Sequence, residues 1–81
     1  MKVTVRLFSV AKEIAGFGER ELELPDVSTA SDVLTKLDSL DPRLADWRKV
    51  FRLAVNQEYV PGDHPLKNGD EVAIIPPVSG G

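Results

Sequence analysis

The chain has no cysteine at all, and its 81 residues include a single histidine, His64. Without cysteine it cannot form a disulfide, hold zinc through thiolates or use a thiol as a nucleophile. One histidine cannot supply a site built from several imidazole ligands. The sequence therefore predicts no metal centre. We expect His64 to help order its loop, because no serine or cysteine partner is evident for it.

Long apolar runs and an excess of basic charge are also lacking. The chain has 10 basic and 13 acidic residues, which leaves a net charge of −3 at pH 7. This mild acidity argues against nucleic-acid binding, which needs a basic surface. No apolar run approaches the ~20 residues that span a bilayer, and residues 1–8 alternate instead of forming the apolar part of a secretory signal. We expect a cytoplasmic protein that binds neither nucleic acid nor membrane.

The small size of the chain limits its activity. A length of 81 residues corresponds to one domain. Such a domain buries only about 60–65% of its unfolded surface, so it holds one modest core and no deep pocket with several supporting layers. We therefore expect a chain that is not an enzyme by itself.

Alternation of apolar and polar residues marks four segments as strands. These predicted strands cover residues 3–8, 19–24, 52–56 and 71–75. The prediction rests on the period of two along a strand, where successive side chains point to opposite faces. Pro25 ends the second strand and Pro76 the last, because proline cannot donate a ladder hydrogen bond.

Helical spacing marks one main helix between the second and third strands. Ser28 or Thr29 is its expected N-cap. Its expected apolar stripe, at helical spacing, consists of Ala30, Val33, Leu34, Leu37 and Leu40. A stripe of this width needs a sheet face to cover it.

Two shorter helical pieces are also expected. One covers residues 10–15 and is closed by Gly16. The other begins after the cap Asp41, with Pro42 at its first position. Leu44 and Trp47 are the expected buried residues of this second piece.

The order of elements is strand, strand, helix, strand, an irregular crossing at residues 64–66, and strand. One mixed sheet wrapped around one main helix satisfies this order. We therefore predict an α+β protein with the β-grasp, ubiquitin-like plan, in which the first and last strands lie parallel at the centre of the sheet. The predicted domain covers residues 1–75, and residues 76–81 form an extended C-terminal tail.

The C-terminal tail is the most informative segment of the chain. It consists of Pro76, Pro77, Val78, Ser79, Gly80 and Gly81. The prolines fix φ and favour a stiff, extended stem. The two glycines carry no side chains, so the terminal carboxylate can enter a channel too narrow for other residues. We predict that the Gly81 carboxylate is the reactive group, and that residues 76–80 insert it into the active site of another protein.

The faces of the predicted strands place an apolar surface beside this tail. Seven residues are expected to cover the helix: Val3, Val5, Leu7, Leu53, Val55, Val72 and Ile74. Phe8, Ala54, Ala73 and Ile75 then point outward. Phe8 and Ile75 end the two central strands, so we predict that they form a partner interface; the alternative is that residues 10–16 fold back and bury Phe8. Lys12 is a candidate for pairing with an acidic partner surface, or else a solvated lysine.

Several motifs together resemble a known family. They are Phe-Ser-Val-Ala-Lys-Glu-Ile-Ala-Gly at residues 8–16, Ala-Val-Asn-Gln at 54–57, Asp-His-Pro-Leu at 63–66, Gly-Asp-Glu-Val-Ala at 69–73 and Pro-Pro-Val-Ser-Gly-Gly at 76–81. Over essentially its whole length the chain resembles the small subunit of molybdopterin synthase. The family's usual threonine before the two glycines is Ser79 here.

This resemblance implies a sulfur carrier in molybdenum-cofactor biosynthesis. In the family, the tail glycine that falls on Gly81 is adenylated with ATP by a separate activating enzyme similar to ubiquitin-activating enzymes. Sulfur from a donor protein then replaces the AMP and leaves a thiocarboxylate. The carrier is thus expected to bind no cofactor on its own; the nucleotide is used by the activating enzyme.

The resemblance also implies a partner and an interface. The carrier joins the large synthase subunit as a non-catalytic, sulfur-donating subunit, in a heterotetramer of two small and two large subunits. It donates sulfur to a cyclic pyranopterin monophosphate precursor, and two carriers supply the two sulfurs of the dithiolene. The family's partner-contacting positions fall on Phe8, Lys12, Tyr59 and Ile75; the last two differ in type from the commoner residues.

Three alternatives remain at this point. The sulfur carrier of thiazole (thiamine) biosynthesis shares the fold and the Gly-Gly end, but it is typically shorter and lacks the motifs at residues 63–66 and 76–78. A ubiquitin-like modifier that is ligated to lysines of target proteins begins with the same carboxylate chemistry. A purely structural interaction domain would have an inert tail.

Overall fold

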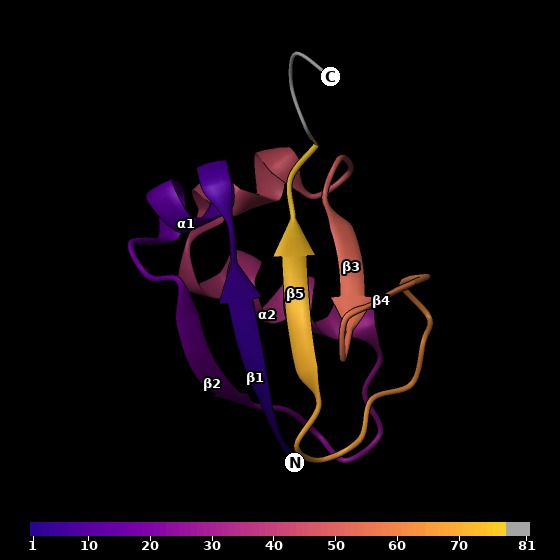
Figure 1. The fold of residues 1–81 in the computed structure, drawn as a ribbon. Coiled ribbons are helices and arrows are strands. Elements are labelled where there is room, and N and C mark those ends of the chain that lie inside the picture. Colours follow the sequence, from indigo (N-terminus) through magenta and orange to yellow (C-terminus); the bar gives the residue numbers. More distant parts are fainter. Residues whose placement is uncertain (78–81) are drawn as a thin grey trace.

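A parallel pair of central strands organises the computed structural model, which describes residues 1–77 (Figure 1). Within this range the strands are β1 (Lys2–Leu7), β2 (Glu19–Glu23), β3 (Arg52–Val55), β4 (Glu58–Val60) and β5 (Glu71–Ile75). They form one five-stranded sheet in the order β2-β1-β5-β3-β4. β1 and β5 are parallel, and the other neighbours are antiparallel. The predicted β-grasp plan, with its parallel first and last strands, is confirmed.

The helix α2 (Ala30–Leu40) covers one face of the sheet. Thr29 is its N-cap, and the Thr29 backbone N–H donates to Asp32 Oδ2 at 2.8 Å. The stripe residues Ala30, Val33, Leu34 and Leu37 are buried as predicted. The prediction for Leu40 is wrong, because its side chain is 46% exposed. The chain turns away after Leu40, and Leu44 of the following 3₁₀ helix is buried in the core at that end.

Two short helices lie at the end of the sheet where β1 and β5 finish (Figure 1). They are α1 (Ser9–Ala15) and the 3₁₀ helix η1 (Pro42–Trp47). α1 ends at Gly16, whose φ of 83° lies in the left-handed region that glycine tolerates. The Arg43 guanidinium donates to the carbonyl oxygen of Ile14 at 2.7 Å, so η1 is tied to the C-terminal turn of α1.

The β3–β4 hairpin contains a strand, β4, that the sequence pattern does not predict. Asn56 and Gln57 join the two strands, with φ values of 50° and 74°. Two successive residues at positive φ are typical of the tight turn that suits the twist of a hairpin. β4 has only three residues, which is too short for alternation to be recognised. The predicted third strand ends at Val55, one residue earlier than expected.

The core lies between the sheet and α2. All seven residues predicted to cover the helix are buried, with exposed fractions of 7% or less: Val3, Val5, Leu7, Leu53, Val55, Val72 and Ile74. Each such side chain contributes roughly 1.5–3 kcal/mol through removal of apolar surface from water. Within residues 1–77, no helix has the length and apolar character needed to cross a bilayer.

Candidate functional site

The candidate site begins where β5 ends. Ile75 pairs with Arg52 of β3 across the sheet, and Pro76 and Pro77 follow it. Pro76 is buried, whereas Pro77 is exposed. The proline ring fixes φ, and it also holds the preceding Ile75 in an extended shape. The chain therefore leaves the domain from a point that is set by packing and by backbone restriction together.

A hollow of about 450 Å³ surrounds this exit point. Its walls come from the ends of β1 and β5, from the start of α1 and from η1, and consist of Phe8, Ser9, Val10, Trp47, Ile75, Pro76 and Pro77. Trp47 is half-buried, so one part of its indole belongs to the packing of η1 and another remains accessible. The base of the tail is thus enclosed by mostly apolar groups.

A second hollow, of about 330 Å³, lies on the outer face of the sheet, on the side opposite α2. We call its apolar part the outer patch, which consists of Phe8, Ala54, Tyr59, Ala73 and Ile75. Phe8 is 42% exposed and Tyr59 is 65% exposed. Ala54 points outward as predicted but is only 5% exposed; its register neighbours in the sheet are Tyr59 on β4 and Ala73 on β5.

Phe8 is exposed because of the backbone around it. Phe8 itself is extended, with φ −128° and ψ 156°, and acts as the N-cap of α1. Ser9 follows with φ 48°, a left-handed conformation that costs a non-glycine residue about 1–3 kcal/mol. The chain therefore turns sharply into α1 directly after Phe8. The alternative that residues 10–16 fold back and bury Phe8 is wrong.

Lys12 lies beside the outer patch in a third hollow, which it lines together with Phe8. Its aliphatic stem lies over Gly18, where an added Cβ would meet Lys12 Cε at 3.2 Å. The structure therefore brings all four predicted interface residues together around one ring: Phe8 shares a hollow with Tyr59 and Ile75, and a neighbouring hollow with Lys12.

Three further residues of this region were not identified from the sequence. Val10 and Trp47 line the hollow at the tail base, and Arg52 stands opposite Ile75 in the sheet. The signal for Arg52 is the strand register, because a residue on the outer face of β3 must lie next to one on β5. Register depends on the pairing of strands distant in sequence, so no local pattern reveals it.

Arginine and aromatic side chains are paired on the outer face. The Arg6 guanidinium carbon lies 5.8 Å from the centroid of the Phe8 ring. The guanidinium carbon of Arg52 lies 5.7 Å from the centroid of the Tyr59 ring. Cations at this distance are attracted to the face of an aromatic ring. The rings of the outer patch are therefore bordered by two guanidinium groups, and the carboxylate of Glu71 lines the same hollow.

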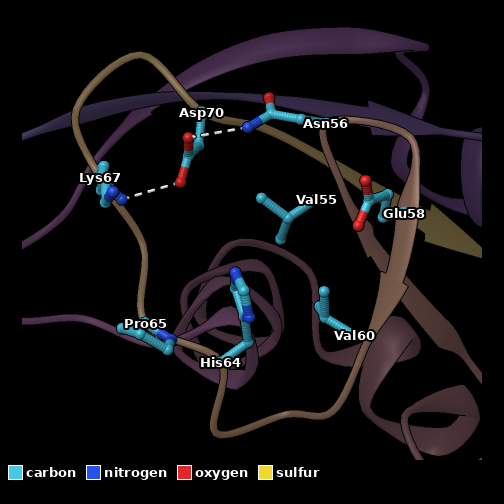
Figure 2. Close-up of a pocket in the computed structure, with 8 residues that line it drawn as sticks. All are labelled: Val55, Asn56, Glu58, Val60, His64, Pro65, Lys67 and Asp70. Carbon is cyan, nitrogen blue, oxygen red and sulfur yellow. Dashed lines mark hydrogen bonds between the residues drawn. The ribbon is translucent and has the colours of Figure 1, made fainter.

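A hollow with a hydrogen-bonded polar cluster on one wall lies at the opposite end of the sheet (Figure 2). Asp70 Oδ1 accepts a hydrogen bond from Asn56 Nδ2 at 3.0 Å, and its Oδ2 accepts one from the Lys67 backbone N–H at 2.8 Å. The Asn56 Oδ1 in turn accepts from the Glu71 backbone N–H at 3.0 Å. These polar groups join the β3–β4 turn to the start of β5, which is a structural task.

His64 points into the same hollow (Figure 2). Its backbone carbonyl accepts a hydrogen bond from the Ala30 N–H at 2.9 Å, which ties the loop to the first turn of α2. Among residues 1–77, no group of three or more histidine, cysteine, aspartate or glutamate side chains is placed to hold a metal ion.

Four of the predicted tail residues lie outside the described part of the chain: Val78, Ser79, Gly80 and Gly81. The prediction that the Gly81 carboxylate is the reactive group therefore stays a prediction. Pro76 and Pro77 are the part of the tail that is described. They line the hollow at the tail base together with Phe8 and Ile75, which also belong to the outer patch.

Comparisons with known proteins cover the whole chain. The sequence model of the ThiS family matches residues 5–81. A molybdopterin synthase sulfur carrier subunit from Chlamydomonas reinhardtii is 45% identical over 83 residues, which cover all of both chains. Among solved structures, a complex of subunits 1 and 2 of molybdopterin-converting factor from Helicobacter pylori contains a chain that is 29% identical, with a TM-score of 0.71 and complete coverage of both chains.

The small archaeal modifier protein 1 from Methanosarcina acetivorans is also similar. It is 29% identical, with a TM-score of 0.78, and the match covers 99% of this chain and 96% of that protein. The family match includes the two terminal glycines as well as the β-grasp domain. The family model matches residues 5–81, and a 45% identical relative matches over the full length of both chains. The chain therefore belongs to the ThiS family.

Proposed function

We propose that this chain is the sulfur-carrier subunit of a molybdopterin synthase, with the Gly81 carboxylate as the carrying group. The observation that carries the proposal is the exit of the chain from β5. Pro76 is buried beside the exposed Phe8 and Ile75, and the sequence then runs to two glycines. A docking surface and a narrow terminus are thus combined at one end of the domain. Whole-chain relatives that are named as this subunit support it.

The carboxylate is activated in two steps, adenylation and replacement of AMP by sulfur. Neither step changes the oxidation state of the carbonyl carbon. A Gly81 carboxylate oxygen attacks the α-phosphorus of ATP, and pyrophosphate leaves to give an acyl adenylate. A sulfide-level sulfur nucleophile then attacks the carbonyl carbon, and AMP leaves to give the thiocarboxylate. A separate adenylyltransferase and a sulfur donor protein carry out these steps, since the domain contributes only the terminus and the surface that presents it.

Sulfur transfer then takes place on the large subunit. The thiocarboxylate sulfur attacks a carbon of the pyranopterin precursor, and an oxygen substituent leaves that carbon as the new carbon–sulfur bond forms. Water then hydrolyses the acyl–sulfur bond, which restores the Gly81 carboxylate and leaves the sulfur on the precursor. Two carriers supply the two sulfurs of the dithiolene, in a cytoplasmic assembly of two small and two large subunits. The solved complex of subunits 1 and 2 from Helicobacter pylori supports a large-subunit partner.

The outer patch and Lys12 form the docking surface in this proposal. Exposed aromatic and branched side chains next to one another are typical of interface cores. Phe8, Tyr59 and Ile75 provide these side chains, and Lys12 adds a cation at the rim. A surface that holds the domain in one orientation also limits where the tail can reach, which raises the effective concentration of the carboxylate in the partner's active site.

The proposal is tested by mass spectrometry of the intact chain. The chain is incubated with its activating enzyme, ATP and a sulfur donor. We expect a mass gain equal to the replacement of one oxygen by one sulfur, and no gain when Gly81 is deleted. An unchanged mass under conditions that convert a known carrier would contradict the proposal. Rescue of a strain defective in molybdenum-cofactor rather than thiazole biosynthesis separates the two carrier pathways.

A protein modifier is a second candidate, favoured by the likeness to the archaeal modifier protein. The same acyl adenylate would then be attacked by a lysine Nζ of a target protein, with formation of an isopeptide bond and loss of AMP. The two candidates differ in their products. Peptides that carry a C-terminal remnant of this chain on lysine, found after proteolysis of cell extract, would support the modifier, and their absence alongside thiocarboxylate would support the carrier.

A further inference from the structure

Three arginine–aromatic pairs are present in the described residues, and two of them flank the outer patch. Arg6 stacks over Phe8 and Arg52 over Tyr59, at 5.8 and 5.7 Å from the ring centroids. The hollow between these rings has a volume of about 330 Å³, and its apolar lining from Ala54, Ala73 and Ile75 is bordered by Gln57 and Glu71. A guanidinium stacked by its flat face on a ring keeps its N–H edges available for other partners.

The two flanking arginines differ in their own ion pairs. Arg6 lies between two carboxylates, with Nε 3.8 Å from Glu19 Oε1 and Nη1 3.7 Å from Glu71 Oε1. No carboxylate within residues 1–77 forms an ion pair with Arg52. Arg52 is exposed and lies opposite Ile75 in the sheet. The Arg52 guanidinium therefore lies next to the tail exit, held against the Tyr59 ring, and no carboxylate in the described part of the chain neutralises its charge.

We infer that Arg52 is a specificity residue that receives an acidic side chain of the large subunit, while an apolar side chain next to that acid enters the hollow beside Tyr59. The inference rests on the proposed function. The planar guanidinium fork matches a carboxylate in two parallel hydrogen bonds. Such a pair fixes the rotation of the carrier about the tail axis, which apolar contacts alone leave poorly determined. Charge complementarity of this kind acts mainly on the association rate.

The third pair provides a matched control. Arg20 lies 5.4 Å from the centroid of the Phe17 ring, and it is exposed. Arg20 pairs in register with the buried Val5 on β1, which places it away from the outer face. Arg20→Gln and Arg52→Gln therefore change the net charge equally, and each removes one stacked guanidinium. They differ in the location of the lost charge.

The test measures the association rate of the full chain with its cognate large subunit over a range of salt concentrations. We expect Arg52→Gln to lower the rate constant about fivefold to tenfold at low salt. The difference should vanish near 1 M salt, where the Debye length is roughly 3 Å. Arg20→Gln should stay within about twofold of the unchanged chain. Arg52→Lys should retain most of the association rate because it keeps the charge, but its complex should dissociate faster because an ammonium group cannot form the two parallel hydrogen bonds.

The outcomes separate this inference from the proposed function. Equal rates for Arg52→Gln and Arg20→Gln, with normal binding by the unchanged chain, would overturn the inference alone. A failure of the unchanged chain to bind the large subunit would overturn the proposed function. An Arg52-dependent change in self-association, measured by sedimentation, without a change in large-subunit binding would assign Arg52 to a contact between copies and would also overturn the inference. Thermal unfolding of each variant confirms that the fold is intact.

Discussion

The two ends of the sheet carry opposite kinds of surface. At the end where β1 and β5 finish, the rings of Phe8 and Tyr59 are exposed beside the exit of the tail. At the other end, Asp70 uses both carboxylate oxygens in hydrogen bonds to Asn56 and to the Lys67 backbone (Figure 2). The polar end is closed within the domain and the apolar end is open. Polar residues often mark a functional site. Here, at the end of the sheet that contains Asp70, they form hydrogen bonds within the domain and stabilise the fold.

The loss of Gly81 is expected to have the largest effect, and to affect only the open end. Deletion of this residue leaves Gly80 as the terminus, so the carboxylate ends about 3.5 Å short of its position in the partner's active site. We expect no detectable thiocarboxylate by intact mass, while the thermal unfolding midpoint stays unchanged. A large drop in that midpoint would show that the terminus also supports the fold, which would weaken the contrast between the two ends.

Truncation of Phe8 should weaken partner binding strongly and the fold only slightly. Phe8→Ala removes a half-exposed ring from the centre of the outer patch, and interface aromatic residues of this kind contribute about 2 kcal/mol or more to binding. A 10- to 100-fold rise in Kd for the large subunit, measured by calorimetry, is therefore expected. The matched control is Val27→Ala, since Val27 is 96% exposed and outside the outer patch. Equal Kd values for the two variants would remove Phe8 from the interface.

Removal of the Asp70 carboxylate should have the opposite effects: a less stable fold and unchanged binding to the partner. Asp70→Ala breaks hydrogen bonds to Asn56 and to the Lys67 backbone, and we expect the free energy of unfolding to fall by about 1–2 kcal/mol. Urea unfolding measures this loss, and Asp63→Ala in the exposed neighbouring turn is the control. Binding to the large subunit should not change. Weaker binding together with unchanged stability would mean that the polar end is a functional surface after all.

The smallest expected effect is a pH dependence at the contact between η1 and α1. The side-chain hydrogen bond from Arg43 lowers the pKa of Asp41 below its ordinary value of 3.8. A carboxyl group with a lowered folded-state pKa stabilises the fold above its unfolded pKa, and this contribution is lost as the pH falls through the folded value. Asp41→Asn should therefore lower the urea midpoint slightly at neutral pH and cease to matter well below pH 3.8.

Asp46→Asn is the control for this measurement, because Asp46 is an exposed carboxylate of the same 3₁₀ helix without an ion pair among the described residues. Comparison of the two variants separates the loss of the hydrogen bond to Arg43 from the loss of one negative charge. If both variants behave alike at neutral and acidic pH, the link from η1 to α1 depends on the Arg43 hydrogen bond to the Ile14 carbonyl alone.

The fold was predictable because its elements have strong local signals. The period-two pattern of β1 and β5 and the helical stripe of α2 predicted a mixed sheet over one helix, and the buried residues agree. The local failures have physical causes as well. β4 is too short to show a period, and Leu40 stands at a helix end, where tertiary contacts decide which side chain is covered.

The candidate site was predictable only in part. Alternation along each strand placed Phe8 and Ile75 on the outer face, and the structure places them in one hollow. The burial of Pro76 was not foreseen, since it requires the walls that α1 and η1 supply. Arg52 was missed because charge alone does not distinguish it from nine other basic residues of the chain.

The sequence by itself determined the chemical character of the terminus and the side of the sheet to which each strand residue points. Both are local properties, because they follow from the absence of side chains at Gly80 and Gly81 and from the pleat of a single strand. Only the tertiary structure decided which outward residues became neighbours. Burial of the apolar face of α2 brings β1 and β5 together in parallel, and β3 pairs with the other edge of β5. These two pairings place Phe8, Arg52 and Pro76 around one exit point.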